Sequence, residues 1–112
     1  MTNKPRTWPM THELKTWPES FGAIFYGYKR FEVRKNDRDY KVGDVLILKE
    51  YIPETKEYSG VEIQAYVTCI TTCENIVQYG MRATGDFIIM SIKVTGTALK
   101  KYKNIADVAQ LA

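Results

Sequence analysis

The spacing of hydrophobic residues changes once near the start of the chain, from a helical period to a strand period. Between residues 17 and 28 the apolar positions recur at helical spacing, and they are Trp17, Phe21, Ile24, Phe25 and Tyr28. Thr16 is expected to cap this helix, Pro18 suits its first turn, and Gly27 suits the position just after its end. We therefore predict a short amphipathic helix whose aromatic stripe is core, with ligand stacking as the alternative for Trp17.

Most of the remaining apolar residues alternate with a period of two, which is typical of half-buried strands. The expected strands are "THELKTW" at 11–17, a strand opened by Lys29 that carries "RFEVR", Val45–Tyr51, "VEIQAYVTCITT" at 61–72 and "DFIIMSIKV" at 86–94. A polar hairpin, "IPETKEYSG", joins the third to the fourth, and residues 74–85 can form a loop with a helical turn. One face of the fourth strand carries Val61, Ile63, Ala65, Val67 and Cys69.

A chain of 112 residues is the size of one domain. Four or five strands with one early helix predict an α+β fold, a small mixed β-barrel of about five strands with helices at its edge. We expect an N-terminal arm at 1–10, the domain at 11–95 and a C-terminal tail at 96–112. In that tail Asn104 can cap a short helix that uses Ile105, Val108 and Leu111, either docked or frayed.

Composition narrows the classes of function without choosing one. The net charge of +3 and the pI near 8.8 favour anionic partners but fall short of a strongly basic nucleic-acid domain. The sequence has no apolar run long enough for a membrane span, and we expect a cytosolic protein. Cys69 and Cys73 lie too far apart on one strand for a disulfide, and His12 is the single histidine, so we expect buried thiols, no metal and no cofactor.

The segment "GYKRFEVRKNDRDYKVGD" at 27–44 concentrates charge on a predicted strand and turn. Phe31 and Val33 share one face of the strand, while Arg30, Glu32 and Arg34 project from the other about 7 Å apart. One interpretation is a solvated face whose ion pairs contribute about 0–1 kcal/mol each. The alternative is a binding site, because Arg34, Asn36 and Arg38 provide planar groups that suit phosphates and base edges.

The run "HELKTWPESFGAIFYGYKRFEVRKNDRDYKVGDVLILKEY" resembles the ASCH superfamily of PUA-like β-barrels. Gly27, Lys29, Glu32 and Arg34 meet its pattern G-x-K-x-x-E-x-R, and "KNDRDYKVGDVLILKEY" is similar to a subfamily of uncharacterised proteins common in phages and prophages. The resemblance covers residues 11–93. It implies a cleft between the barrel and the early helix, lined by His12, Lys15, Lys29, Glu32, Arg34, Asn36 and Arg38.

The resemblance implies an RNA- or nucleotide-binding module, in which phosphates pair with Lys29, Arg34 or Arg38. Glu32 would hold these cations or accept from a base amino group such as cytosine N4, and bases would stack on Tyr26, Tyr28 or Tyr40.

The first alternative is an amidohydrolase acting on N4-acylated cytidine, with Lys29 as base and Glu32 positioning water. Related small proteins use a lysine, a threonine and a glutamate, but Glu32 stands at the threonine position here. Glu74 is a candidate second carboxylate. The other alternative is a phage accessory protein that binds a host protein.

Overall fold

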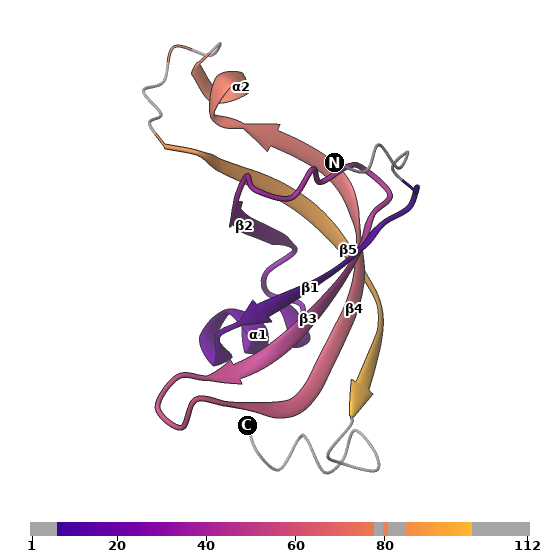
Figure 1. Cartoon of the computed structure of the whole chain (residues 1–112), viewed down its shortest axis with the longest axis vertical. Coiled ribbons are helices and arrows are strands. Elements are labelled where there is room, and N and C mark those ends of the chain that lie inside the picture. The colour runs from indigo at the N-terminus through magenta and orange to yellow at the C-terminus, as the bar shows by residue number, and fades with distance from the viewer. Residues whose placement is uncertain (1–6, 78–79, 81–84, 100–112) are drawn as a thin grey trace, which may run out of the picture.

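A five-stranded mixed sheet, curled into a half-barrel, forms the protein in the computed structural model, which describes residues 7–77, 80 and 85–99 (Figure 1). The elements in chain order are β1 (Thr11–Thr16), α1 (Pro18–Phe25), β2 (Phe31–Lys35), β3 (Val45–Ile52), β4 (Glu57–Thr72), α2 (Cys73–Val77) and β5 (Phe87–Leu99). The strand order is β1-β3-β4-β5-β2, with β1 parallel to β3 and the other neighbours antiparallel. The predicted barrel-like mixed sheet is thus confirmed at this level.

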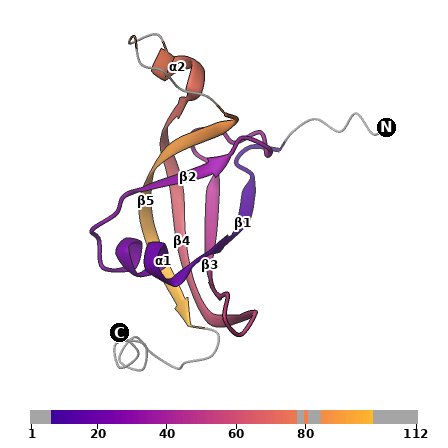
Figure 2. The same ribbon diagram turned by 90° about the vertical axis from the view of Figure 1, so that its left-hand side faces the viewer.

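The core lies on the concave side of the curled sheet, where α1 also lies (Figures 1 and 2). Helix α1 contributes Phe21 and Ile24, which are 4% and 1% exposed. The strands contribute the inward members of their alternating pattern, chiefly Leu14, Leu46, Leu48, Val61, Ile63, Ala65, Val67, Ile88, Met90 and Ile92. The opposite, convex face of β1, β3 and β4 is not covered by α1 (Figure 2).

Helix α1 ends as predicted but begins differently. Gly27, at φ +82°, follows the helix end, and the N–H groups of Gly27 and Tyr28 donate to the carbonyls of Ile24 and Ala23 in a Schellman arrangement. The predicted Thr16 cap is wrong, since Trp17 occupies the N-cap position without a side-chain hydrogen bond. Strand β1 continues through Thr16, whose hydroxyl faces inward and has other partners.

The aromatic stripe of α1 is only half buried. Trp17 is 60% and Tyr28 is 88% exposed, so the prediction that they belong to the core is wrong. The short helix packs on the sheet through Phe21 and Ile24, while Trp17 and Tyr28, just beyond its two ends, are exposed.

A bulge in β4 overturns the predicted burial of Cys69. The register between β4 and β5 shifts between Val67 and Cys69, so the alternation of the strand loses its phase there. Val67 is buried, whereas Cys69 is exposed and Cys73 is half-buried, and both are free thiols. Periodicity alone could not locate the extra residue.

Two strands are longer than the sequence pattern predicts. Strand β4 begins at Glu57, inside the expected polar hairpin, and β5 continues to Leu99, beyond Val94. The predicted C-terminal helix at residues 104–111 lies outside the described residues. No helix in the described ranges is both long and apolar enough to cross a membrane.

Candidate functional site

Side chains, in place of a backbone ladder, join the two edge strands of the half-barrel. Strands β1 and β2 stand at opposite ends of the strand order. Arg34 on β2 donates from Nη1 to the Lys15 carbonyl at 2.8 Å, and Arg38 donates from Nη1 to the Glu13 carbonyl at 3.0 Å. We call this junction the β1–β2 seam. These two hydrogen bonds connect the edges of the curled sheet.

Glu32 anchors the seam from inside. Its side chain is 3% exposed, and its Oε2 accepts a hydrogen bond of 2.7 Å from Nε of Arg34, which is 23% exposed. Arg34 also donates from Nη2 to the Thr16 hydroxyl at 3.0 Å, and that hydroxyl donates to the Leu14 carbonyl. Glu32 Oε1 is buried and has no hydrogen-bond partner. A buried carboxylate oxygen of this kind calls for a donor from water or a ligand.

The interpretation of a solvated charged face is therefore wrong for Glu32. Pairing with β5 places Glu32 opposite buried Met90, and residues opposite one another share a face of the sheet. Phe31 and Val33 consequently point outward and are 44% and 50% exposed. Arg34 offsets the free-energy cost of burying the Glu32 carboxylate because its guanidinium forms an ion pair with it.

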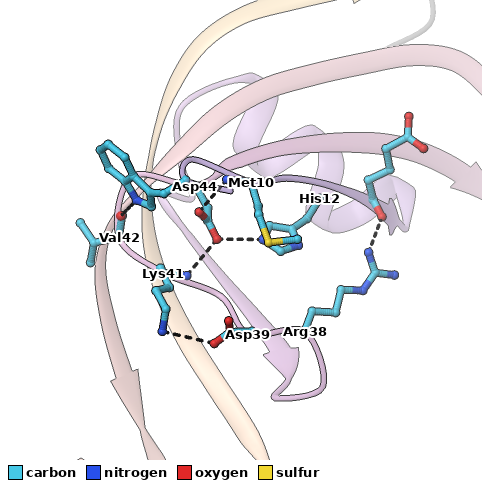
Figure 3. A network of polar contacts seen from close by, with 9 residues as sticks. Met10, His12, Arg38, Asp39, Lys41, Val42 and Asp44 are labelled. Carbon is cyan, nitrogen blue, oxygen red and sulfur yellow. Dashed lines mark hydrogen bonds and ion pairs between the residues drawn. The ribbon is translucent and has the colours of Figure 1, made fainter. Parts of the chain in front are cut away.

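A second polar network surrounds Asp44, in the turn before β3 (Figure 3). The Asp44 carboxylate accepts from the backbone N–H groups of Met10 and Lys41 and bonds His12 Nε2 at 2.9 Å. Next to it the Trp8 indole donates to the Val42 carbonyl at 3.0 Å. These contacts fasten residues 8–10, the last part of the expected arm, to the turn.

His12 is 5% exposed and occupies the interior side of β1. Its ring lies 4.7 Å from that of Tyr40, with a tilt of 50°. His12 also lines a cavity of about 840 Å³ together with Arg38, Glu13, Asp37 and others from the same strand and turn. The histidine is thus both a partnered interior residue and part of a cavity wall.

Tyr40 connects the two networks. Burial raises the pKa of its phenol, an effect that the positive charges of Arg38 and Arg34 oppose and that Asp37 and Glu32 reinforce. Because Tyr40 is only 7% exposed, its expected role as a stacking platform is wrong. Tyr26 and Tyr28, at 51% and 88% exposed, remain accessible.

Lys29 belongs to a different pocket, of about 560 Å³, between the start of α1 and the β3–β4 turn. Its ammonium donates to the Ser20 hydroxyl at 2.6 Å, and Trp17, Glu19 and Glu54 also line the pocket. The pocket therefore combines an accessible indole with a cation and a hydroxyl. Sequence patterns gave no signal for Ser20, because a serine in the first turn of a helix is ordinarily a local feature.

The residues predicted to line one cleft occupy several places. Glu32 and Arg34 meet at the seam, to which Lys15 contributes its backbone carbonyl. His12 and Arg38 share the cavity beside β1, whereas Lys29 lines the α1 pocket. Asn36 lines a smaller cavity of about 220 Å³, which also includes Glu74. Within the described part of the chain, no group of three or more His, Cys, Asp or Glu side chains is arranged to hold a metal ion.

Comparisons with known proteins agree on a phage-associated relationship. A family model described as a domain of unknown function, DUF3850, matches residues 11–92. An uncharacterised 12.9 kDa protein of Escherichia phage P2, described by its position in the GpA 3′ region, is 31% identical over 86 residues. The alignment covers 74% of this chain and 77% of the phage protein. The matched range contains every element from β1 to α2 and the first part of β5, up to residue 92.

Loss of Arg34 alone is expected to destabilise the fold more than loss of the whole pair. Arg34→Met leaves the Glu32 carboxylate buried without a counter-ion and should lower the free energy of unfolding by about 3 kcal/mol. Adding Glu32→Gln removes that charge and should restore much of the loss. Urea denaturation of the single and double variants measures the coupling. Arg30→Met, an exposed arginine just before the same strand, is the control, and an equal effect there would contradict the assignment.

The Tyr40 phenol should give the fold a stability that is lost at alkaline pH. Its pKa in the folded protein is raised above that of the unfolded chain, so the contribution is complete below about pH 10 and declines as the pH rises through the folded-state pKa. Tyr40→Phe should therefore flatten the decline of stability above pH 10. Denaturation at several pH values tests this, with Tyr28→Phe as the control. An unchanged slope in Tyr40→Phe would contradict it.

Proposed function

Because this chain belongs to the phage-associated DUF3850 family, whose activity is undefined, we propose a function from its own geometry: it is an RNA- or nucleotide-binding module of the PUA-like, ASCH type. The curled mixed sheet with an early helix on its concave side supports this proposal, as does the motif formed by Gly27, Lys29, Glu32 and Arg34. The observation that carries it is the unpaired oxygen of Glu32.

Glu32 Oε1 is a buried hydrogen-bond acceptor that has no donor within the described part of the protein. The exocyclic amino group of a base, such as cytosine N4, is a planar donor of suitable chemistry. Strands β1 and β2 are joined by side chains, so an entering base edge has no backbone ladder to break at the seam. In this proposal the base amino group donates to Glu32 Oε1 while Arg34 continues to hold Oε2.

Arg34 retains capacity for the same ligand. Three N–H groups of its guanidinium, one each on Nε, Nη1 and Nη2, are used within the protein, and a guanidinium carries five. The half-exposed side chain thus has donors left for a base carbonyl or a phosphate. Because Arg34 also joins β1 to β2, a loss of ligand affinity on its removal could not be distinguished from a loss of stability. Glu32 is therefore the better residue to test.

Cytidine monophosphate is expected to bind more tightly than uridine monophosphate. The two ligands share sugar and phosphate but differ at position 4, where cytosine has an amino donor and uracil has a carbonyl acceptor. A hydrogen bond to a buried carboxylate corresponds to a preference of roughly tenfold or more. Isothermal titration calorimetry measures both affinities, and Glu32→Gln, which offers both an acceptor and a donor, should narrow the difference. Equal binding of the two nucleotides to the wild-type protein would overturn the role of Glu32.

A second candidate function, hydrolysis of N4-acylated cytidine, is favoured by one contact. The threonine that the related small amidohydrolases use is replaced here by Glu32. The Ser20 hydroxyl, however, lies 2.6 Å from the Lys29 ammonium. In this scheme Ser20 Oγ would attack the acyl carbonyl as its proton passes to the Lys29 nitrogen. The C–N4 bond would break as Lys29 returns the proton to N4, and water would then hydrolyse the acyl-serine. Ser20 rather than Glu32 is the partner of Lys29 in this scheme.

Hydrolysis predicts release of acetate from N4-acetylcytidine. Proton NMR should show the acetyl amide signal replaced by free acetate in the presence of wild-type protein. Ser20→Ala and Lys29→Met should each abolish this change, whereas Ser91→Ala, an exposed serine on β5, should not. Turnover that persists in Ser20→Ala would exclude the serine mechanism, and no acetate from the wild type would exclude the activity.

A further inference from the structure

Two lysine and two tyrosine side chains contact one another on the convex face of the sheet, which is not covered by α1. We call this patch the lysine–tyrosine surface, and its members are Lys15 on β1, Lys49 and Tyr51 on β3, and Tyr58 on β4. Strand pairing places Lys15 beside Lys49, and Tyr51 beside Tyr58. The patch therefore spans three adjacent strands.

Direct contacts organise this surface. The Lys15 ammonium lies 4.1 Å from the centre of the Tyr51 ring, and the Lys49 ammonium lies 5.2 Å from that of Tyr58. The two tyrosine rings meet edge to face at 5.1 Å. Each lysine is thus held beside an aromatic ring with its ammonium close to the surface, which limits the freedom lost when a ligand binds.

The surface is accessible, and each of its lysines has an acidic residue on the same face of the sheet. Lys15 is exposed, the Lys49 side chain is 29% exposed, and Tyr58 is 48% exposed. The Glu62 carboxylate lies 4.0 Å from the Lys49 ammonium, and its side chain is 11% exposed, so it presents little charge to solvent. Exposed Glu13 lies two residues before Lys15 on β1.

We infer that this surface binds single-stranded nucleic acid, with phosphates on Lys15 and Lys49 and a base stacked on Tyr58. Interleaved cations and aromatic rings on an open sheet face suit this ligand, because cations follow the backbone and a ring accepts any base. The inference rests on the proposed function and extends it, since the seam would read one base while the convex face holds flanking nucleotides.

The competing interpretation is purely structural. Exposed cation–π contacts stabilise a fold by about 0.5–1 kcal/mol without any ligand. The two interpretations differ in one measurable property. Only a phosphate-binding lysine changes how binding depends on salt, because each phosphate contact releases counter-ions.

The test uses fluorescence anisotropy with labelled 12-nucleotide oligo(rU) and oligo(dT) over a series of salt concentrations. Lys15→Ala and Lys49→Ala should each reduce the slope of log affinity against log salt by about 0.7. Tyr58→Ala should weaken binding about fivefold or more at each salt concentration. Lys15→Arg and Lys49→Arg should keep the wild-type slope. Equal binding of the two oligomers supports backbone recognition at this surface, and a preference for one identifies its polymer.

Lys41→Ala is the matched control. It removes the same charge from an exposed lysine in the turn before β3, where the residue pairs only weakly with Asp39 at 3.2 Å. Its salt slope should match that of the wild type. Thermal melting of each variant separates loss of stability from loss of binding. Lys15→Ala and Lys49→Ala variants that are less stable but keep the wild-type salt dependence of binding would overturn the inference in favour of the structural interpretation.

Titration of cytidine monophosphate separates this inference from the proposed function. The lysine variants should bind the mononucleotide as the wild type does, because the seam is intact in them. If mononucleotide binds but oligomer binding ignores Lys15, Lys49 and Tyr58, the convex surface is refuted and the seam proposal stands. If neither mononucleotide nor oligomer binds the wild-type protein, both are refuted.

Discussion

The ion pair between Glu32 and Arg34 is the constraint on which the shape of this protein depends. A five-stranded sheet with this strand order leaves two free edges, and only a complete barrel would pair them through the backbone. Here Arg34 reaches from β2 to the backbone and the hydroxyl of β1 while Glu32 holds it from below. Burying the carboxylate costs free energy that a well-bonded guanidinium offsets. The sheet can therefore curl without closing completely.

Closure by side chains has a consequence for ligand binding. Arg34 and Arg38 join β1 to β2 in place of a backbone ladder, and one buried oxygen of Glu32 beside this junction has no hydrogen-bond partner among the described residues. In the proposed function, the residues that join the edges of the half-barrel would also be the residues that meet the ligand. Glu32 and Arg34 would then serve both the fold and recognition.

Asp44 plays the corresponding part at the other end of β1. Its carboxylate bonds the backbone N–H groups of Met10 and Lys41 and the ring of His12. These bonds hold the start of β1 beside the start of its parallel neighbour, β3. Tyr40 packs between this network and the seam. The concave side is consequently filled and cross-linked, while the convex side of β1, β3 and β4 presents its lysines and tyrosines to solvent.

The sequence by itself determined the secondary structure of most of the chain and its class of fold. The alternation in β3 and the helical spacing with Gly27 at its end predict elements that the structure contains, because local backbone preferences decide them. The run "KNDRDYKVGDVLILKEY" also pointed to a phage-associated family, which the family match supports. Tertiary structure alone decided which side of β2 faces inward, because its pairing with β5 overrides the usual preference for burying Phe31 and Val33. It also decided the hydrogen-bond partners of Thr16, Ser20 and Asp44, because those partners come from other segments of the chain. The bulge in β4 decided the exposure of Cys69, and the alternation of residue types in the sequence does not reveal a bulge.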